Sequence, residues 1–94
     1  MLAREDIVTL HNLTRTLGAG HLEHTGGGCV ALTVPLHGGA TLVVTHDGDL
    51  LAFRYPSGAW DEGIYEGAEM VAGGSADEVV PVLVDLLAKE GDKS

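Results

Sequence analysis

Cysteine, aromatic residues and long apolar runs are all scarce in this chain. It has one cysteine among 94 residues, so it cannot form an internal disulfide, and nothing indicates an oxidising compartment. Only four residues are aromatic, so aliphatic side chains must fill most of the core. The longest uninterrupted apolar runs, such as residues 79–84, are far too short to span a bilayer.

Positive charge is scarce as well. Five Lys and Arg residues oppose 14 Asp and Glu residues, which gives a net charge of −9. Residues 1–46 carry a net −1 and residues 47–94 a net −8. Such a surface repels nucleic acid and anionic membranes, and it suits a basic protein partner or serves solubility alone. The N-terminal MLAREDIVTL has acids where a signal peptide has its apolar stretch, so we expect a cytoplasmic protein without membrane or nucleic-acid partners.

Two segments have the apolar spacing of amphipathic helices. Near the N-terminus, Ile7, Leu10, Leu13 and Leu17 form one stripe, which a glycine at position 18 or 20 would end. Near the C-terminus, the sequence SADE at residues 75–78 matches a capping box and precedes an apolar face. Pro81 lies past the first turn of that helix, and a start at Asp77 would bring it closer to the tolerated positions.

Between these helices the chain alternates β-forming runs with turn residues. The sequence Asp47-Gly48-Asp49 is a strong hairpin signal, and connections this short force antiparallel neighbours. His21–Gly28 is predicted to be a loop. The predicted strands are Cys29–Leu36, Ala40–His46, Leu50–Tyr55 and Ala59–Glu66, with Glu69–Ala72 as a possible fifth strand at the edge.

These elements predict one α+β domain over residues 1–94. A four-stranded, possibly five-stranded, antiparallel sheet would carry the N- and C-terminal helices on its aliphatic face, in the order αββββα. The other face would hold Thr33, Thr41 and Thr45 beside Val43. That face would be solvated or covered by a partner.

Metal-ligating and nucleophilic residue types occur, but their patterns are incomplete. His21-x-x-His24 with Cys29 and His37 has the ligand types of a zinc site, yet no paired C-x-x-C accompanies them. Cys29 and His24 could form a thiolate–imidazole pair, but no orienting third group can be identified. We therefore predict no metal site, no catalytic residue and no cofactor, and a binding role rather than an enzyme.

Two glycine-rich runs, residues 18–20 and 26–28, superficially match phosphate-binding loops. A dinucleotide fingerprint follows a strand and opens a helix, and neither run does so. One alternative function is a small-molecule-binding protein or small enzyme. Its candidate ligand loop is His24, Gly26, Gly27, Gly28 and Cys29.

An acidic and aromatic segment supplies the candidate interaction residues. Trp60 either fills the core, which is the preferred interpretation, or forms an interface hot spot. A bulge at Gly63 would bring Tyr65 onto the face of Trp60. An acidic DNA mimic is a further alternative, and it requires Asp47 and Asp49 on one surface with the acids of this segment. The candidate interaction residues are Trp60, Tyr65, Asp61, Glu62, Glu66 and Glu69.

Two runs, HTGGGCVAL at residues 24–32 and WDEGIY at residues 60–65, resemble motifs of small proteins encoded by bacteriophages of actinobacteria, mycobacteriophages especially. That family has no assigned activity, so the resemblance implies no catalytic residues. It implies a phage accessory protein made inside the host. Together with the acidic bias, it predicts a non-enzymatic protein-interaction module that binds a host protein or forms a homodimer.

Overall fold

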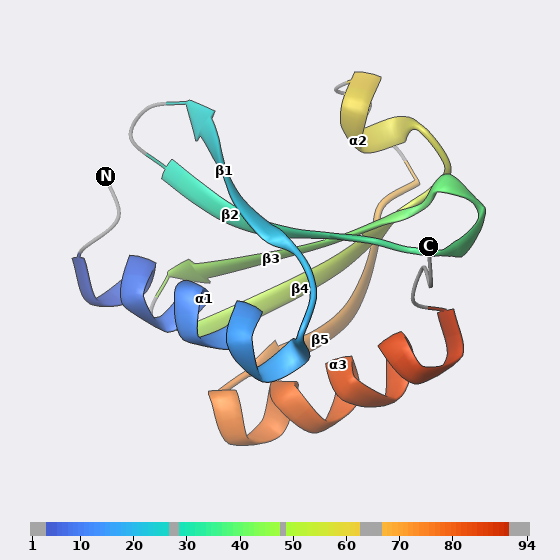
Figure 1. Cartoon of the computed structure of the whole chain (residues 1–94). Coiled ribbons are helices and arrows are strands. Elements are labelled where there is room, and N and C mark those ends of the chain that lie inside the picture. The colour runs from blue at the N-terminus through green and yellow to red at the C-terminus, as the bar shows by residue number, and fades with distance from the viewer. Residues whose placement is uncertain (1–3, 27–28, 48, 63–66, 91–94) are drawn as a thin grey trace.

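A five-stranded antiparallel sheet carries two long helices on one of its faces (Figure 1). The structure, a computed structural model, describes residues 4–26, 29–47, 49–62 and 67–90. The predicted α+β class, with a helix at each end of the chain, is confirmed. The elements are α1 (Arg4–Leu17), β1 (His21–Gly26), β2 (Cys29–Pro35), the 3₁₀ turn η1 (His37–Gly39), β3 (Thr41–Asp47), β4 (Asp49–Tyr55), α2 (Ala59–Glu62), β5 (Glu69–Gly74) and α3 (Ala76–Glu90).

Each strand of the sheet pairs with the next strand in the chain, in the order β1-β2-β3-β4-β5. β1 and β5 are therefore its two edges. Cross-strand partners share a face, so the pairs Leu32↔Val44 and Val44↔Ala52 form part of one aliphatic face. The hairpin predicted around residue 48 is confirmed by the pairing of Asp47 with Asp49.

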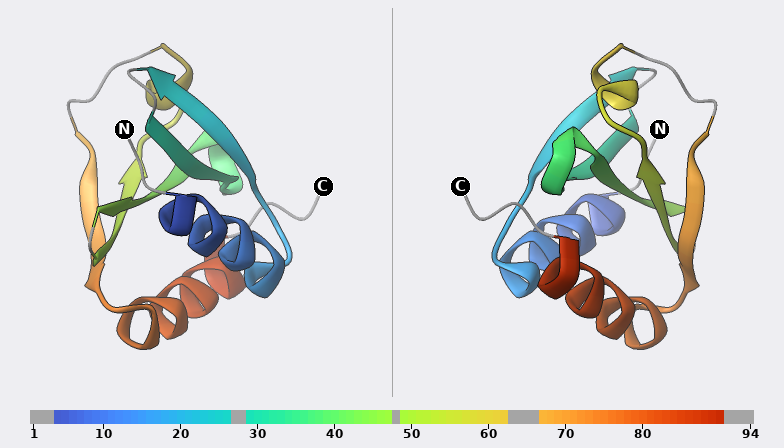
Figure 2. Two further views of the ribbon diagram at one scale, coloured as in Figure 1. Left: turned by 90° about the vertical axis from the view of Figure 1, so that its left-hand side faces the viewer. Right: turned by 90° about the vertical axis from the view of Figure 1, so that its right-hand side faces the viewer.

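Both helices cover that aliphatic face, which we call the helix face. Leu10 and Leu13 of α1 and Val79 and Leu83 of α3 are buried in one cluster with aliphatic residues of β2, β3 and β4. The two views of Figure 2 show α1 and α3 together on one side of the strands, with α2 apart from them. Within the described ranges, neither long helix combines the length and apolar character that crossing a bilayer would need.

The helix ends follow the predicted signals. α1 ends at Leu17, and the N–H of Gly18 donates to the carbonyl of Thr14 at 3.0 Å, with φ of +69°. At the start of α3, the carbonyl of Ser75 accepts from the N–H groups of Glu78 and Val79 at 3.0 and 2.9 Å. α3 therefore begins at Ala76, and Pro81 lies inside it, on its exposed side.

The loop predicted over residues 21–28 is wrong for its first six residues. His21–Gly26 is a strand, β1, because its backbone pairs with β2 along the free side of Cys29–Pro35. Among the described side chains of this strand, only Leu22 packs against the core. The segment therefore lacks the apolar alternation by which strands are recognised in a sequence.

The predicted fourth strand, residues 59–66, is also wrong where the structure describes it. Ala59–Glu62 is the short helix α2, in which the N–H of Glu62 donates to the carbonyl of Gly58 at 3.1 Å. Residues 63–66 lie outside the described residues, and the bulge predicted at Gly63 falls among them. The possible fifth strand is confirmed as β5, which runs on to Gly74.

Candidate functional site

A cavity of about 310 Å³ opens on the face of the sheet opposite α1 and α3. We call this the outer face; Thr33, Val43 and Phe53 are aligned across it. The walls come from β1, β2, the start of β3, α2 and the turn that includes η1. The polar and aromatic side chains in its walls are those of His21, Glu23, Thr33, Thr41 and Trp60.

The register of β1 explains which of its side chains reach this cavity. His21 pairs with Thr33 and Glu23 pairs with Ala31, whereas Leu22 pairs with the core residue Leu32. Because side chains alternate along a strand, His21 and Glu23 share the outer face with Thr33. The missed strand β1 therefore supplies two of the functional groups in the cavity.

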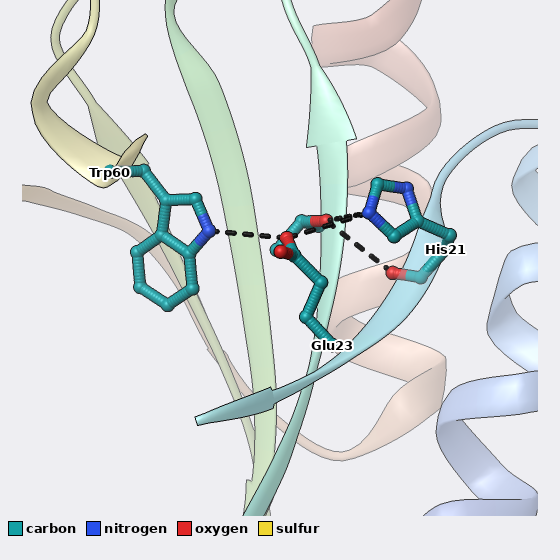
Figure 3. A network of polar contacts seen from close by, with 4 residues as sticks. His21, Glu23 and Trp60 are labelled. Carbon is teal, nitrogen blue, oxygen red and sulfur yellow. Dashed lines mark hydrogen bonds and ion pairs between the residues drawn. The ribbon is translucent and has the colours of Figure 1, made fainter. Parts of the chain in front are cut away.

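Four polar groups converge at the cavity wall. The indole N–H of Trp60 donates to Oε2 of Glu23 at 3.2 Å, and Nε2 of His21 lies 3.5 Å from the same oxygen. The hydroxyl of Thr33 is 3.3 Å from Nε2 of His21. Figure 3 shows the Glu23 carboxylate between the indole of Trp60 and the imidazole of His21. A carboxylate, an imidazole, a hydroxyl and an indole thus surround one small space.

Trp60 lies in this wall and not in the aliphatic core, so the preferred interpretation of it as a core residue is wrong. It is half-buried, and its ring makes an edge contact with Tyr55, with ring centroids 5.1 Å apart and an interplanar angle of 68°. The aromatic neighbour predicted for Trp60 was Tyr65, which lies outside the described residues. The aromatic ring that contacts Trp60 is that of Tyr55, the last residue of β4.

Hydrogen bonding lowers the pKa of the Glu23 carboxyl group. A hydrogen bond with the Thr33 hydroxyl is the largest influence that lowers the pKa of Glu23, and burial partly opposes it. The hydrogen bond from Trp60 and the electrostatic interaction with His21 lower this pKa further. The Glu23 carboxylate is therefore ionised at neutral pH.

The turn around η1 is tied to the turn before α2, and this contact fixes the rim of the cavity. The N–H of Gly58 donates to the carbonyl of Gly39 at 3.2 Å. Gly39 has φ of +85°, and a Cβ there would lie 2.7 Å from Oγ of Ser57. The Ser57 hydroxyl could rotate away from such a Cβ, so the positive φ is the main reason that glycine suits this position.

The polar cluster does not form a catalytic relay. In such a relay the nucleophile bonds one imidazole nitrogen and the orienting carboxylate bonds the other. Here Thr33 and Glu23 both approach Nε2 of His21. Thr33 is also only 2% exposed, so its hydroxyl serves to hold its neighbours in place.

The two histidines His21 and His24 of the zinc pattern considered from the sequence lie on opposite faces of the sheet. His21 lies on the outer face, whereas His24 pairs with the buried residue Val30 and lies on the opposite face. In the part of the chain that the structure describes, no three His, Cys, Asp or Glu side chains lie close enough together to hold a metal ion.

The candidate ligand loop is the tip of the β1–β2 hairpin. Gly26 pairs with Cys29 across that tip, and Gly27 and Gly28 lie outside the described residues. Neither His24 nor Gly26 belongs to the described lining of the cavity.

The acidic residues separate into two groups. Glu62 in α2 and Glu69 at the start of β5 are exposed near one end of the β3–β4 ladder, while Asp49 is exposed at the other end, beside the hairpin turn. Six residues of strand, roughly 20 Å, separate Asp49 from Tyr55. These carboxylates do not form the continuous surface that a DNA mimic requires. Asp61 lies in α2, and Glu66 is outside the described residues.

Glu23 is the functional residue that the sequence did not single out. It lies 37 positions before Trp60, and no local spacing links the two. One signal was present, because Glu23 is the only acid between Asp6 and Asp47. An isolated acid in a segment otherwise free of carboxylates is a reason to look for a specific partner.

The chain matches no protein-family model, no curated protein and no solved structure. Its function is therefore inferred from the outer-face cavity and from the charge of the whole chain.

Proposed function

We propose that this protein is a non-enzymatic interaction module that binds a basic segment of a partner protein at the outer face of its sheet. The observation that carries the proposal is the Glu23 carboxylate, which lies beside Trp60 in an open cavity at an edge strand. Aromatic residues are enriched where binding energy concentrates, and a carboxylate beside one favours a cationic group of the partner.

The net charge of the chain supports a basic partner. At −9, the protein attracts positively charged surfaces and speeds their encounter, and it repels a second copy of itself. This favours a different protein over a homodimer. If the chain is phage-encoded, as the resemblance of residues 24–32 and 60–65 implies, that partner is a host protein.

The position of the cavity suggests how an extended segment could bind. Among the described strands β1 pairs only with β2, so its other side is an edge that offers backbone N–H and C=O groups. A partner strand added there would place alternate side chains beside His21 and Glu23. Backbone hydrogen bonds would then supply affinity, and the cavity would supply specificity.

A capture experiment with matched charge variants tests this function. Wild-type protein, Glu23→Lys and Asp85→Lys are used to capture partners from an actinobacterial lysate, followed by mass spectrometry. Asp85 is an exposed residue of α3, where its ion pair with Lys89 contributes little to stability. Both variants change the charge equally, and only one of them alters the cavity.

We expect one partner rich in Lys and Arg to be retained by the wild type and by Asp85→Lys and to be lost with Glu23→Lys. Raising the salt from about 50 mM to about 500 mM should weaken its capture. A partner held equally by all three proteins would contradict the proposal. So would a wild-type protein that captures nothing reproducible.

A further inference from the structure

We infer that the cavity between β1, η1 and α2 is a receptor for a single cationic side chain, the guanidinium of arginine or the ammonium of lysine, supplied by the partner. The inference rests on the proposed function, because it names the chemistry of that contact. It can nevertheless be tested without the partner, since a small cation needs only the cavity.

The size of the cavity suits one side chain. Its volume of about 310 Å³ lies at the lower end of the range of roughly 300–1,000 Å³ found for small-molecule sites. One wall is the edge strand β1, so an extended segment beside that strand could insert a side chain without burying its own backbone.

The charge of the Glu23 carboxylate and that of the whole chain favour a cation. Glu23 and His21 are the titratable side chains in its described lining, and Glu23 is ionised at neutral pH. A phosphate or carboxylate ligand would meet this carboxylate as well as the negative field of the whole chain. A cation would be attracted by both.

The Glu23 carboxylate has acceptor capacity for such a ligand. An ionised carboxylate offers about four lone-pair positions, and the groups in contact with it are the Trp60 indole N–H at 3.2 Å and Nε2 of His21 at 3.5 Å. These contacts hold its orientation without using every lone pair. Because its geometry is already fixed, little freedom is lost when a guanidinium or ammonium group donates to it.

The indole supplies the second recognition element. Trp60 lines the cavity, and its position is held by the hydrogen bond to Glu23 and by the edge contact with Tyr55. Tryptophan is the best aromatic partner for a cation. A carboxylate and an indole on neighbouring walls would contact the head group and the stem of a long basic side chain together.

Trp60 also makes the experiment direct, because it is the only tryptophan. The indole ¹⁵N–¹H signal reports on the hydrogen bond to Glu23 and is followed by NMR as each probe is added. The probes are N-acetyl-arginine amide, N-acetyl-lysine amide and, as an uncharged analogue of the first, N-acetyl-citrulline amide. Glu23→Gln keeps an acceptor for the indole and removes the charge, and Asp85→Asn removes a charge from the exposed side of α3.

We expect saturable shifts with the arginine and lysine probes, with dissociation constants in the millimolar range typical of weak single contacts. Citrulline should bind at least about fivefold more weakly to the wild type, and arginine at least about fivefold more weakly to Glu23→Gln. Asp85→Asn should bind arginine as the wild type does.

Equal binding of citrulline and arginine to the wild type would overturn the inference, and this comparison does not depend on the folding of any variant. Absence of any shift with arginine up to about 50 mM would overturn it as well. If the probes fail while capture of the partner still depends on Glu23, the inference fails and the proposed function stands. If the probes bind and no partner is captured, the proposed function fails and the cation site stands.

Discussion

Thr33 and Trp60 together set the position and the pKa of the Glu23 carboxylate. A glutamate on an edge strand would ordinarily be a solvated charge, but here the indole of Trp60 in α2 donates to it and the Thr33 hydroxyl of β2 lowers its pKa. Neither group is a sequence neighbour of Glu23. The site is therefore a product of the sheet register and of the placement of α2. The sequence drew attention to His21, Thr33 and Trp60 for separate reasons, but nothing in it linked them to one another or to Glu23.

The pH dependence of stability should reveal the ionised state of Glu23. Because its pKa is lowered by folding from a value of 4.5, its charge stabilises the fold above that pH, and this contribution is lost as the pH falls through the lowered pKa. The groups that face it are His21, Thr33 and Trp60. Glu23→Gln should therefore lower the free energy of unfolding at pH 7 by under about 1 kcal/mol, since the side chain is 40% exposed.

Urea unfolding of Glu23→Gln and wild type at about pH 7 and about pH 3 measures this effect. The difference in stability should be present at neutral pH and shrink in acid. If the difference in stability is the same at both pH values, the loss in Glu23→Gln comes from packing and not from the charge.

Two glycines at the end of α1 provide a matched pair for testing the close approach of the chain to β2. Gly20 has φ of +94°, and a Cβ there would lie 2.7 Å from Cγ2 of Val34 and 2.8 Å from the carbonyl oxygen of Thr33. Gly18 has φ of +69° with no atom within 4 Å of its Cβ position. Gly18→Ala should destabilise by about 1 kcal/mol through its backbone conformation alone.

Gly20→Ala should destabilise by about 2 kcal/mol or more, because it adds a collision with β2 to the same conformational penalty. Thermal and urea unfolding of the two variants would measure the difference. Similar losses in both would show that the chain can move away from β2 at Gly20 without penalty.

At the level of elements, the sequence predicted the helices with regular apolar spacing and the strands bounded by clear turn signals. α1 and α3 repeat their apolar residues at helical spacing, and the strands β2, β3 and β4 are separated by strong turn signals. β1 was missed because an edge strand can be held by backbone pairing with few apolar side chains. α2 was misassigned because Trp60 and Ile64 are four residues apart, a spacing that fits both a strand face and a helix turn.

Pro81 is the clearest conflict between an element and its sequence. It lies inside α3 on the exposed side, where it removes one helical hydrogen bond, to the carbonyl of Asp77. Pro81→Ala should raise the free energy of unfolding by about 1–3 kcal/mol. Val82→Ala at the neighbouring exposed position, 42% accessible, is the control and should change it by less than about 0.5 kcal/mol.

Urea unfolding of both variants measures these effects, with helix content followed by circular dichroism. If Pro81→Ala leaves the stability unchanged, the proline is accommodated in α3 without penalty.

At the level of the whole molecule, charge is the dominant property. The 14 acids and five basic side chains make the folded chain repel itself, and salt screens that repulsion. The melting temperature should therefore rise by a few degrees when the salt is raised from about 20 mM to about 500 mM. Differential scanning calorimetry in sodium chloride and in choline chloride measures the rise and separates screening from specific ion binding. A melting temperature that is flat or falls in both salts would contradict this explanation.

The nearest-neighbour order of the strands has a consequence for synthesis of the chain. Each hairpin can form as soon as its two strands leave the ribosome, because no strand waits for a distant partner. α1 precedes the strands and can cover part of the helix face early, but the part that Val79 and Leu83 bury stays exposed until α3 emerges. A nascent chain stalled before residue 76 would therefore expose part of the apolar face of its sheet, to which chaperones bind. Only completion of the C-terminal helix covers this surface and frees the chain from the chaperones.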